Sequence, residues 1–140
     1  MPSFPARRMD EDSYEHWSTD TVRWSDTDRI GHVNHLAIGA YFETGRSRFI
    51  AELEEPHQTF VTASLTMEFI RELHWPDLVR IGTAVIEVGN TSCKLIQGVF
   101  SNGSCVALAT TVLVLIDSDT RQPVAIPDQQ RSMMGLHALK

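Results

Sequence analysis

The chain has 140 residues, of which 42% are hydrophobic and 21% are charged, so it can bury the core of one folded domain. Its 18 acidic and 12 basic residues give a formal net charge of -6. This balance argues against a nucleic acid as the main partner, because phosphate backbones require clustered positive charge. The longest apolar run, 105–116, is too short to cross a membrane, so we expect no membrane partner.

Two features favour a cytoplasmic location. No apolar segment follows Arg7 and Arg8, so the beginning of the sequence does not have the pattern of a secretory signal peptide. Cys93 and Cys105 are the only cysteines, whereas small secreted scaffolds usually carry several disulfides. We expect both to be reduced thiols in the core.

Hydropathy patterns predict the elements in chain order. Residues 1–18 mix proline, arginine and acidic side chains without a period, which indicates a flexible arm ahead of a single domain over 19–140. Loose alternation over 19–24 predicts a short strand, and the polar segment 25–35 predicts a loop. Residues 36–53 form the best helix candidate. They are apolar around most of the helix circumference, which is typical of a buried helix.

After Pro56 the hydrophobic period changes to two, which predicts β-structure. The predicted strands cover 61–69, 78–88, 92–100 and 104–116, and a short terminal helix is predicted within 128–139. Asn102-Gly103 is a strong hairpin signal between the last two strands. A helix that is apolar nearly all round needs a sheet that wraps it, so the sequence predicts an α+β hotdog fold, a curved antiparallel sheet around one long central helix.

The strand 104–116 is apolar on both faces. One face can contact the helix, and the other needs a second covering surface. A partner subunit is the economical choice, so we expect a homodimer.

The segment that enters the long helix carries the most informative polar residues. Asp28, His32 and Asn34 lie within seven residues of one another. A helix N-terminus offers unpaired amides and a positive dipole end, which suit a developing oxyanion, and a nearby carboxylate can act as base or nucleophile. The alternative is purely structural: Asn34 caps the helix, and Asp26 and Asp28 cap a turn.

The pattern S-D-T-D-x-x-G-H-V-N-H, followed by Tyr41-Phe42-Glu43 and Arg46, resembles the 4-hydroxybenzoyl-CoA thioesterase-like family of hotdog acyl-CoA thioesterases over 19–118. The resemblance implies hydrolysis of an acyl-CoA to free acid and CoA, with no cofactor and no metal. It implies that Asp28 is the nucleophile or general base and that the backbone amide of His35 is the oxyanion donor. His32 and Asn34 are implied to shape the pocket. The usual H-V-N-N ends here in His35, which is compatible with a role played by a backbone group.

Family members of this type build each site between two protomers, which implies a homodimer and, further, a dimer of dimers. The substrate-binding residues implied by the family positions are Gly31, Ser64, Thr66, Asn90, Thr91, Ser92 and Lys94. For the turn 90–92, an ordinary hairpin role remains the alternative.

Other functions remain open at this stage. A non-catalytic module that binds acyl-CoA or acyl-carrier protein, and a thioesterase acting on acyl-carrier protein, are the main alternatives. A zinc site from Asp28, His32 and His35 is disfavoured because the two histidines need not share a helix face. A Ser-His-Asp hydrolase is disfavoured because the chain lacks G-x-S-x-G.

Overall fold

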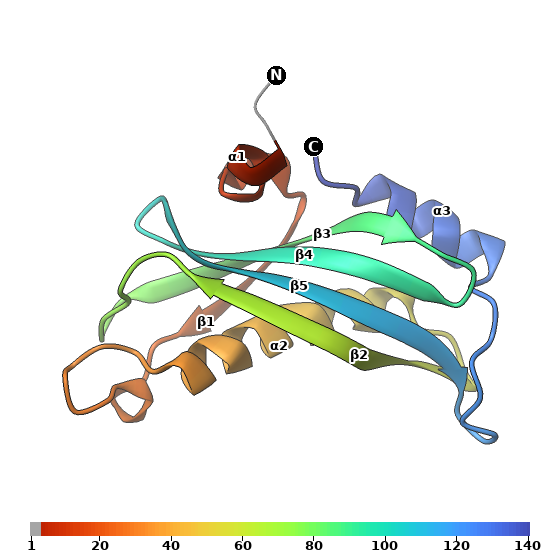
Figure 1. Cartoon of the computed structure of the whole chain (residues 1–140), viewed down its shortest axis with the longest axis horizontal. Coiled ribbons are helices and arrows are strands. Elements are labelled where there is room, and N and C mark those ends of the chain that lie inside the picture. The colour runs from red at the N-terminus through yellow and green to blue at the C-terminus, as the bar shows by residue number, and fades with distance from the viewer. Residues whose placement is uncertain (1–3) are drawn as a thin grey trace.

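The computed structural model describes residues 4–140, which form one antiparallel sheet with a long helix across one of its faces (Figure 1). Over these residues the sheet has five strands in the order β1-β3-β4-β5-β2. The elements are α1 (Phe4–Arg8), η1 (Glu11–Ser13), β1 (His16–Thr21), η2 (Trp24–Asp26), α2 (His35–Leu53), β2 (Gln58–Phe69), β3 (Leu78–Val88), β4 (Ser92–Ser101), β5 (Ser104–Asp117) and α3 (Asp128–Leu136). The predicted α+β architecture of a sheet around one central helix is confirmed.

The helix α2 begins where the sequence supplies a cap. The Asn34 side chain accepts a hydrogen bond from the Ala37 amide at 2.8 Å, which satisfies one of the unpaired amides of the first turn. The helix ends at Leu53, shortly before Pro56, which cannot continue it.

The prediction that α2 is buried around its circumference is wrong for a single chain. One face packs on the sheet through buried side chains such as Tyr41, Phe42 and Phe49. The opposite face carries small or charged residues, among them Ala40, Glu43, Ser47 and Arg48, and it is exposed. Leu36, in the first turn, is 87% exposed.

The covering of β5 also differs from the prediction. Val106 and Leu108, like Ala107 and Ala109, are buried within this one chain. A cluster of Tyr14, Ile96, Phe100, Cys105 and Leu108 covers part of the sheet on the side away from α2. Tyr14 comes from the N-terminal segment, so the chain itself fills much of the space that a partner was expected to fill.

The N-terminal segment is therefore more structured than the predicted arm over 1–18. Residues 1–3 lie outside the described residues, and α1, η1 and the beginning of β1 occupy the rest of this range. β1 starts at His16, three residues before the predicted start at Thr19. The Tyr14 hydroxyl donates to the Arg8 carbonyl at 2.7 Å, which ties α1 to the sheet.

At the other end of the chain, α3 and the residues after it close one end of the sheet (Figure 1). Gln130 donates to the Leu53 carbonyl at the end of α2 at 2.7 Å, and Met134 is fully buried. Ala138 forms a parallel bridge to Val85 of β3. In the described part of the chain, no helix is long and apolar enough to cross a membrane.

The expectation for the cysteines agrees with the structure. Cys93 and Cys105 are both free and buried. Burial raises the pKa of each thiol to about 11, so both are neutral and unreactive near neutral pH.

Candidate functional site

A cavity of about 420 Å³ lies at the beginning of α2, where the loop 28–34, the end of β2 and the segment 70–73 meet. Polar and charged lining comes from Asp28, His32, His35, Arg71 and Glu72. The apolar lining residues are Ile30, Val33, Ile38, Phe69, Ile70 and Leu73. Three of the four predicted catalytic residues therefore line one space.

Asp28 is held at the cavity by its own loop. One carboxylate oxygen, Oδ1, accepts hydrogen bonds from the amides of Ile30 at 3.0 Å and His32 at 3.3 Å. The Asp28 amide donates to the His32 carbonyl at 2.8 Å, which closes the turn. Both side-chain hydrogen bonds use Oδ1, so Asp28 organises the loop through one of its two carboxylate oxygens.

Asn34 does not line the cavity, but it fixes the start of α2. Its side-chain amide donates to the Asp26 carbonyl at 2.8 Å while its oxygen caps Ala37. The Asp26 carboxylate in turn accepts from the Tyr41 hydroxyl at 2.6 Å and the Arg23 amide at 2.9 Å. Burial, with a further contribution from the hydrogen bond to Asp26, raises the pKa of Tyr41 above its usual range. Asn34 and Asp26 thus join the loop to the helix.

His35 is the first residue of α2, so its amide cannot bond within the helix and lies at the positive end of the dipole. Its imidazole stacks on Phe69 of β2, with ring centroids 4.0 Å apart and planes 12° apart. The ring therefore forms part of the cavity wall.

His32 and Glu72 come together from separate loops. His32 Nε2 lies 3.1 Å from Glu72 Oε2, and the same carboxylate oxygen lies 3.7 Å from His74 Nε2. Glu72, His74 and Phe69 were not predicted as site residues from the sequence. They lie far along the chain from Asp28, and no local motif marks them.

The remaining predicted substrate-binding residues are not brought to this cavity within one chain. Gly31 lies in the loop with a φ of +84°, and its amide donates to the Asp28 carbonyl at 3.0 Å. Ser64 and Thr66 alternate with Leu65 and Met67 along β2. A Cβ on Gly39 of α2 would lie 3.6 Å from Met67 Cε. Met67 therefore points toward the helix, and Ser64 and Thr66 point away from it.

The turn between β3 and β4 contains Asn90 and Thr91, with Ser92 and Lys94 following on β4. It lies at the opposite end of the sheet from the start of α2 (Figure 1). The Lys94 ammonium lies 3.7 Å from the Glu87 carboxylate. These residues do not contact the candidate site of their own chain.

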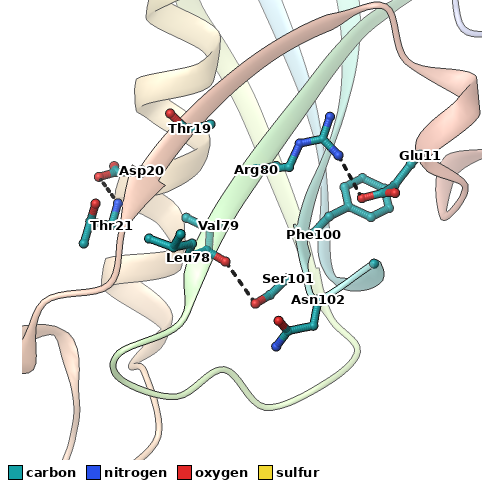
Figure 2. Close-up of a pocket in the computed structure, with 11 residues that line it drawn as sticks. Glu11, Thr19, Asp20, Thr21, Leu78, Val79, Arg80, Phe100, Ser101 and Asn102 are labelled. Carbon is teal, nitrogen blue, oxygen red and sulfur yellow. Dashed lines mark hydrogen bonds and ion pairs between the residues drawn. The ribbon is translucent and has the colours of Figure 1, made fainter.

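A second cavity, of about 590 Å³, lies beside β1, β3 and β4 (Figure 2). Its charged groups are paired with neighbours: Arg80 lies 3.1 Å from Glu11 and packs over the Trp17 ring at 4.0 Å. Ser101 donates to the Leu78 carbonyl at 3.0 Å. Among the described residues, the only helix start in the lining of this second cavity is Glu11, the first residue of the three-residue helix η1, whereas the smaller cavity lies at the start of the 19-residue helix α2. The smaller cavity is therefore the better candidate for chemistry at a carbonyl.

The fold defines a class: an antiparallel sheet around one long helix is the hotdog architecture. Residues 22–133 match the model of the thioesterase-like superfamily, and the chain belongs to that family.

Individual relatives agree with this placement. The chain is 27% identical over 127 residues to the Haemophilus influenzae protein named acyl-CoA thioesterase YbgC, covering 85% of this chain and 92% of that protein. A thioesterase from Thermus thermophilus, solved with coenzyme A and Zn, is 25% identical with a TM-score of 0.80, covering 89% of this chain and 95% of that one. The Pseudomonas aeruginosa PA5185 protein shares the fold with a TM-score of 0.84 at 23% identity, covering 94% and 98% of the two chains.

Proposed function

We propose that this protein hydrolyses acyl-CoA thioesters to a free acid and CoA. The observation that carries the proposal is that Asp28 and the first residue of α2 line the same cavity. Acyl transfer requires a nucleophile or base, which a carboxylate can supply. It also requires donors that stabilise the developing oxyanion, which unpaired helix amides can supply. The family and the relatives that are named thioesterases support the same reaction.

In the proposed mechanism, the thioester carbonyl lies at the start of α2 with its oxygen facing the His35 amide. The helix dipole and this amide stabilise the negative charge that develops on the oxygen. Asp28 either attacks the carbonyl carbon or removes a proton from an attacking water. In the first route the CoA thiolate leaves and water hydrolyses the mixed anhydride; in the second the thiolate leaves directly.

The other residues position the reacting groups. His32 and Asn34 are positioning residues: the His32 amide bonds to Asp28, and Asn34 sets the start of the helix. The apolar lining of the cavity, including Phe69 and Ile70, provides a surface for the acyl group. Arg71, also in the lining, provides positive charge for an anionic portion of the substrate.

We further propose that the working unit is a homodimer, and that two dimers associate. β2 is an edge strand whose residues 62–66 are exposed, and a long unpaired edge is a template for pairing with another strand. Leu65 and Phe69 are large exposed apolar side chains on this strand. Ser64 and Thr66, together with the 90–94 segment, would then serve the site of a neighbouring protomer.

The test is hydrolysis of a panel of acyl-CoAs, followed with a thiol-trapping dye. The Asp28→Asn variant keeps an oxygen that can accept the loop hydrogen bonds, so the loop remains folded. We expect it to lose at least about 10²-fold in kcat. Asp119→Asn, an exposed position in the turn after β5, is the matched control and retains wild-type activity. An Asp28→Asn variant as active as wild type would refute the mechanism.

One observation supports a second candidate, a non-catalytic module that binds acyl-CoA or acyl-carrier protein. The Asp28 carboxylate accepts two loop hydrogen bonds, which is sufficient to account for an aspartate at this position without catalysis. Binding of an acyl-CoA without turnover across the panel would favour this module. Turnover of acyl-carrier protein thioesters alone would indicate the other thioesterase class.

A further inference from the structure

Two imidazoles converge on one carboxylate oxygen at the rim of the candidate site. His32 Nε2 and His74 Nε2 lie 3.1 Å and 3.7 Å from Glu72 Oε2. The donor atoms of all three side chains lie within 4.8 Å of one another. The two imidazole rings meet edge to face, with centroids 5.2 Å apart. The three donors therefore surround a common point.

The spacing fits a first-row transition metal. Zinc binds histidine nitrogens and carboxylate oxygens at about 2.0–2.2 Å, so two ligands of a tetrahedral ion lie about 3.3–3.5 Å apart. The two measured nitrogen–oxygen distances lie on either side of this range. The two nitrogen–oxygen separations must each change by about 0.2 Å, and the two nitrogens must approach by at most about 1.5 Å for the stated ligand geometry. Rotation of these solvent-accessible side chains can supply both changes.

The backbone holds the two halves of the cluster opposite each other. The Val33 amide donates to the Leu73 carbonyl at 2.8 Å, and this bond joins the loop of His32 to the segment of Glu72 and His74. Leu73 is only 1% exposed and anchors that segment in the core. Glu72 and His74 flank it, and both side chains lie beside His32, Glu72 through its carboxylate and His74 through its ring.

The cluster is also open to solvent. The side chains of His32, Glu72 and His74 are 30%, 63% and 51% exposed. Two histidines, one carboxylate and an open fourth position for water form a donor set typical of zinc. Surface ion pairs contribute little to stability, so ion pairing alone gives weak reason for two histidines to share one carboxylate oxygen.

We propose that His32, Glu72 and His74 bind one zinc ion per chain at the rim of the cavity. This set differs from Asp28, His32 and His35, the set considered from sequence, because the His35 ring stacks on Phe69. The proposed site is independent of the hydrolytic mechanism, in which no step passes through a metal. It holds whether or not the protein is a thioesterase.

The experiment is calorimetric titration of zinc into the chelator-treated full-length protein, without acyl-CoA. The variants are His74→Gln and Glu72→Gln. The matched control is His57→Asn, which removes an exposed histidine elsewhere and places a residue tolerant of a positive φ at a position where φ is 69°. Cobalt(II) titration, read by its visible absorption, reports the coordination geometry.

We expect one zinc per chain for the wild type and for His57→Asn. His74→Gln and Glu72→Gln weaken binding at least about tenfold, since loss of even an outer-shell partner commonly costs that much. The wild type also gives the intense cobalt spectrum of a low-coordinate nitrogen–oxygen site. Absence of saturable zinc binding overturns the proposal, and so does equal affinity in wild type and His74→Gln. Because no substrate is present, either result leaves the proposed hydrolysis to be judged separately.

Discussion

The Asn34 side chain makes two hydrogen bonds whose contributions to stability can be separated by substitution. Its oxygen caps Ala37 at 2.8 Å, and its side-chain amide donates to the Asp26 carbonyl at 2.8 Å. Asn34→Ala removes both bonds. The cap is worth about 1 kcal/mol and the second hydrogen bond about another 1 kcal/mol. We therefore expect the free energy of unfolding to fall by about 2 kcal/mol, which lowers Tm by roughly 6 °C for a chain of this size.

Asn34→Ser is the matched variant, because serine can cap the helix but cannot reach back as an amide donor. We expect it to recover about 1 kcal/mol of the loss, measured by chemical denaturation. Activity should behave differently from stability. The bond to Asp26 joins the loop of Asp28 to the helix start, so both variants lose kcat with little change in KM for acyl-CoA.

Two results would refute this reasoning. Full wild-type stability in Asn34→Ser would show that the bond to Asp26 contributes nothing to folding. Wild-type kcat in Asn34→Ser, together with a normal fold, would show that the position of the loop does not depend on this bond. The stability measurement stands even where the protein has no thioesterase activity.

Three further predictions follow from packing, ionisation and the exposed edge. Gly45→Ala places a Cβ 2.5 Å from Ile81 Cγ2, so we expect a loss of about 1–3 kcal/mol by thermal or chemical unfolding, and unchanged stability would contradict the close approach. The pKa of Tyr41 is raised in the folded protein, so above about pH 10 this phenol ionises in the unfolded chain while it stays neutral in the folded one. The free energy of unfolding should then fall with pH by up to about 1.4 kcal/mol per pH unit more in wild type than in Tyr41→Phe, and equal slopes would exclude this linkage. Light scattering should give a dimer or tetramer, because β2 is an open edge, whereas a strict monomer would oppose the shared site.

Much of the fold could be read from local patterns. β3 runs from Leu78 to Val88, as the alternation predicts, and Asn34 caps a helix that ends at Leu53 as expected. These features depend on near neighbours in the chain, through hydrophobic period and cap chemistry. The start of β1 at His16 was missed because the segment 16–18 gains its place by pairing with β3, whose residues lie more than 60 positions away.

Which face of a helix stays exposed to solvent also depends on contacts that are distant in sequence. Apolar residues around α2 suggested complete burial, yet Leu36 is 87% exposed, because one curved sheet reaches only one side. β5 was expected to need a partner, and Tyr14 instead covers part of it from the N-terminal segment. In both cases the sequence pattern reports that a surface is apolar and does not report which surface meets it.

The candidate site also combines residues that a local motif marks with residues that only long-range contacts bring in. Asp28, His32 and His35 could be named from one short motif because the loop and the helix start are contiguous in sequence. Glu72 and His74 could not, because the contact depends on the bond between Val33 and Leu73, which connects two loops 40 residues apart. Leu73 holds that connection through burial, and a buried leucine is indistinguishable in sequence from any other core residue. The same core contact that fixes the loop of Asp28 therefore also creates the cluster proposed to bind zinc. A change at Leu73, which also lines the cavity, should consequently disturb both sites together.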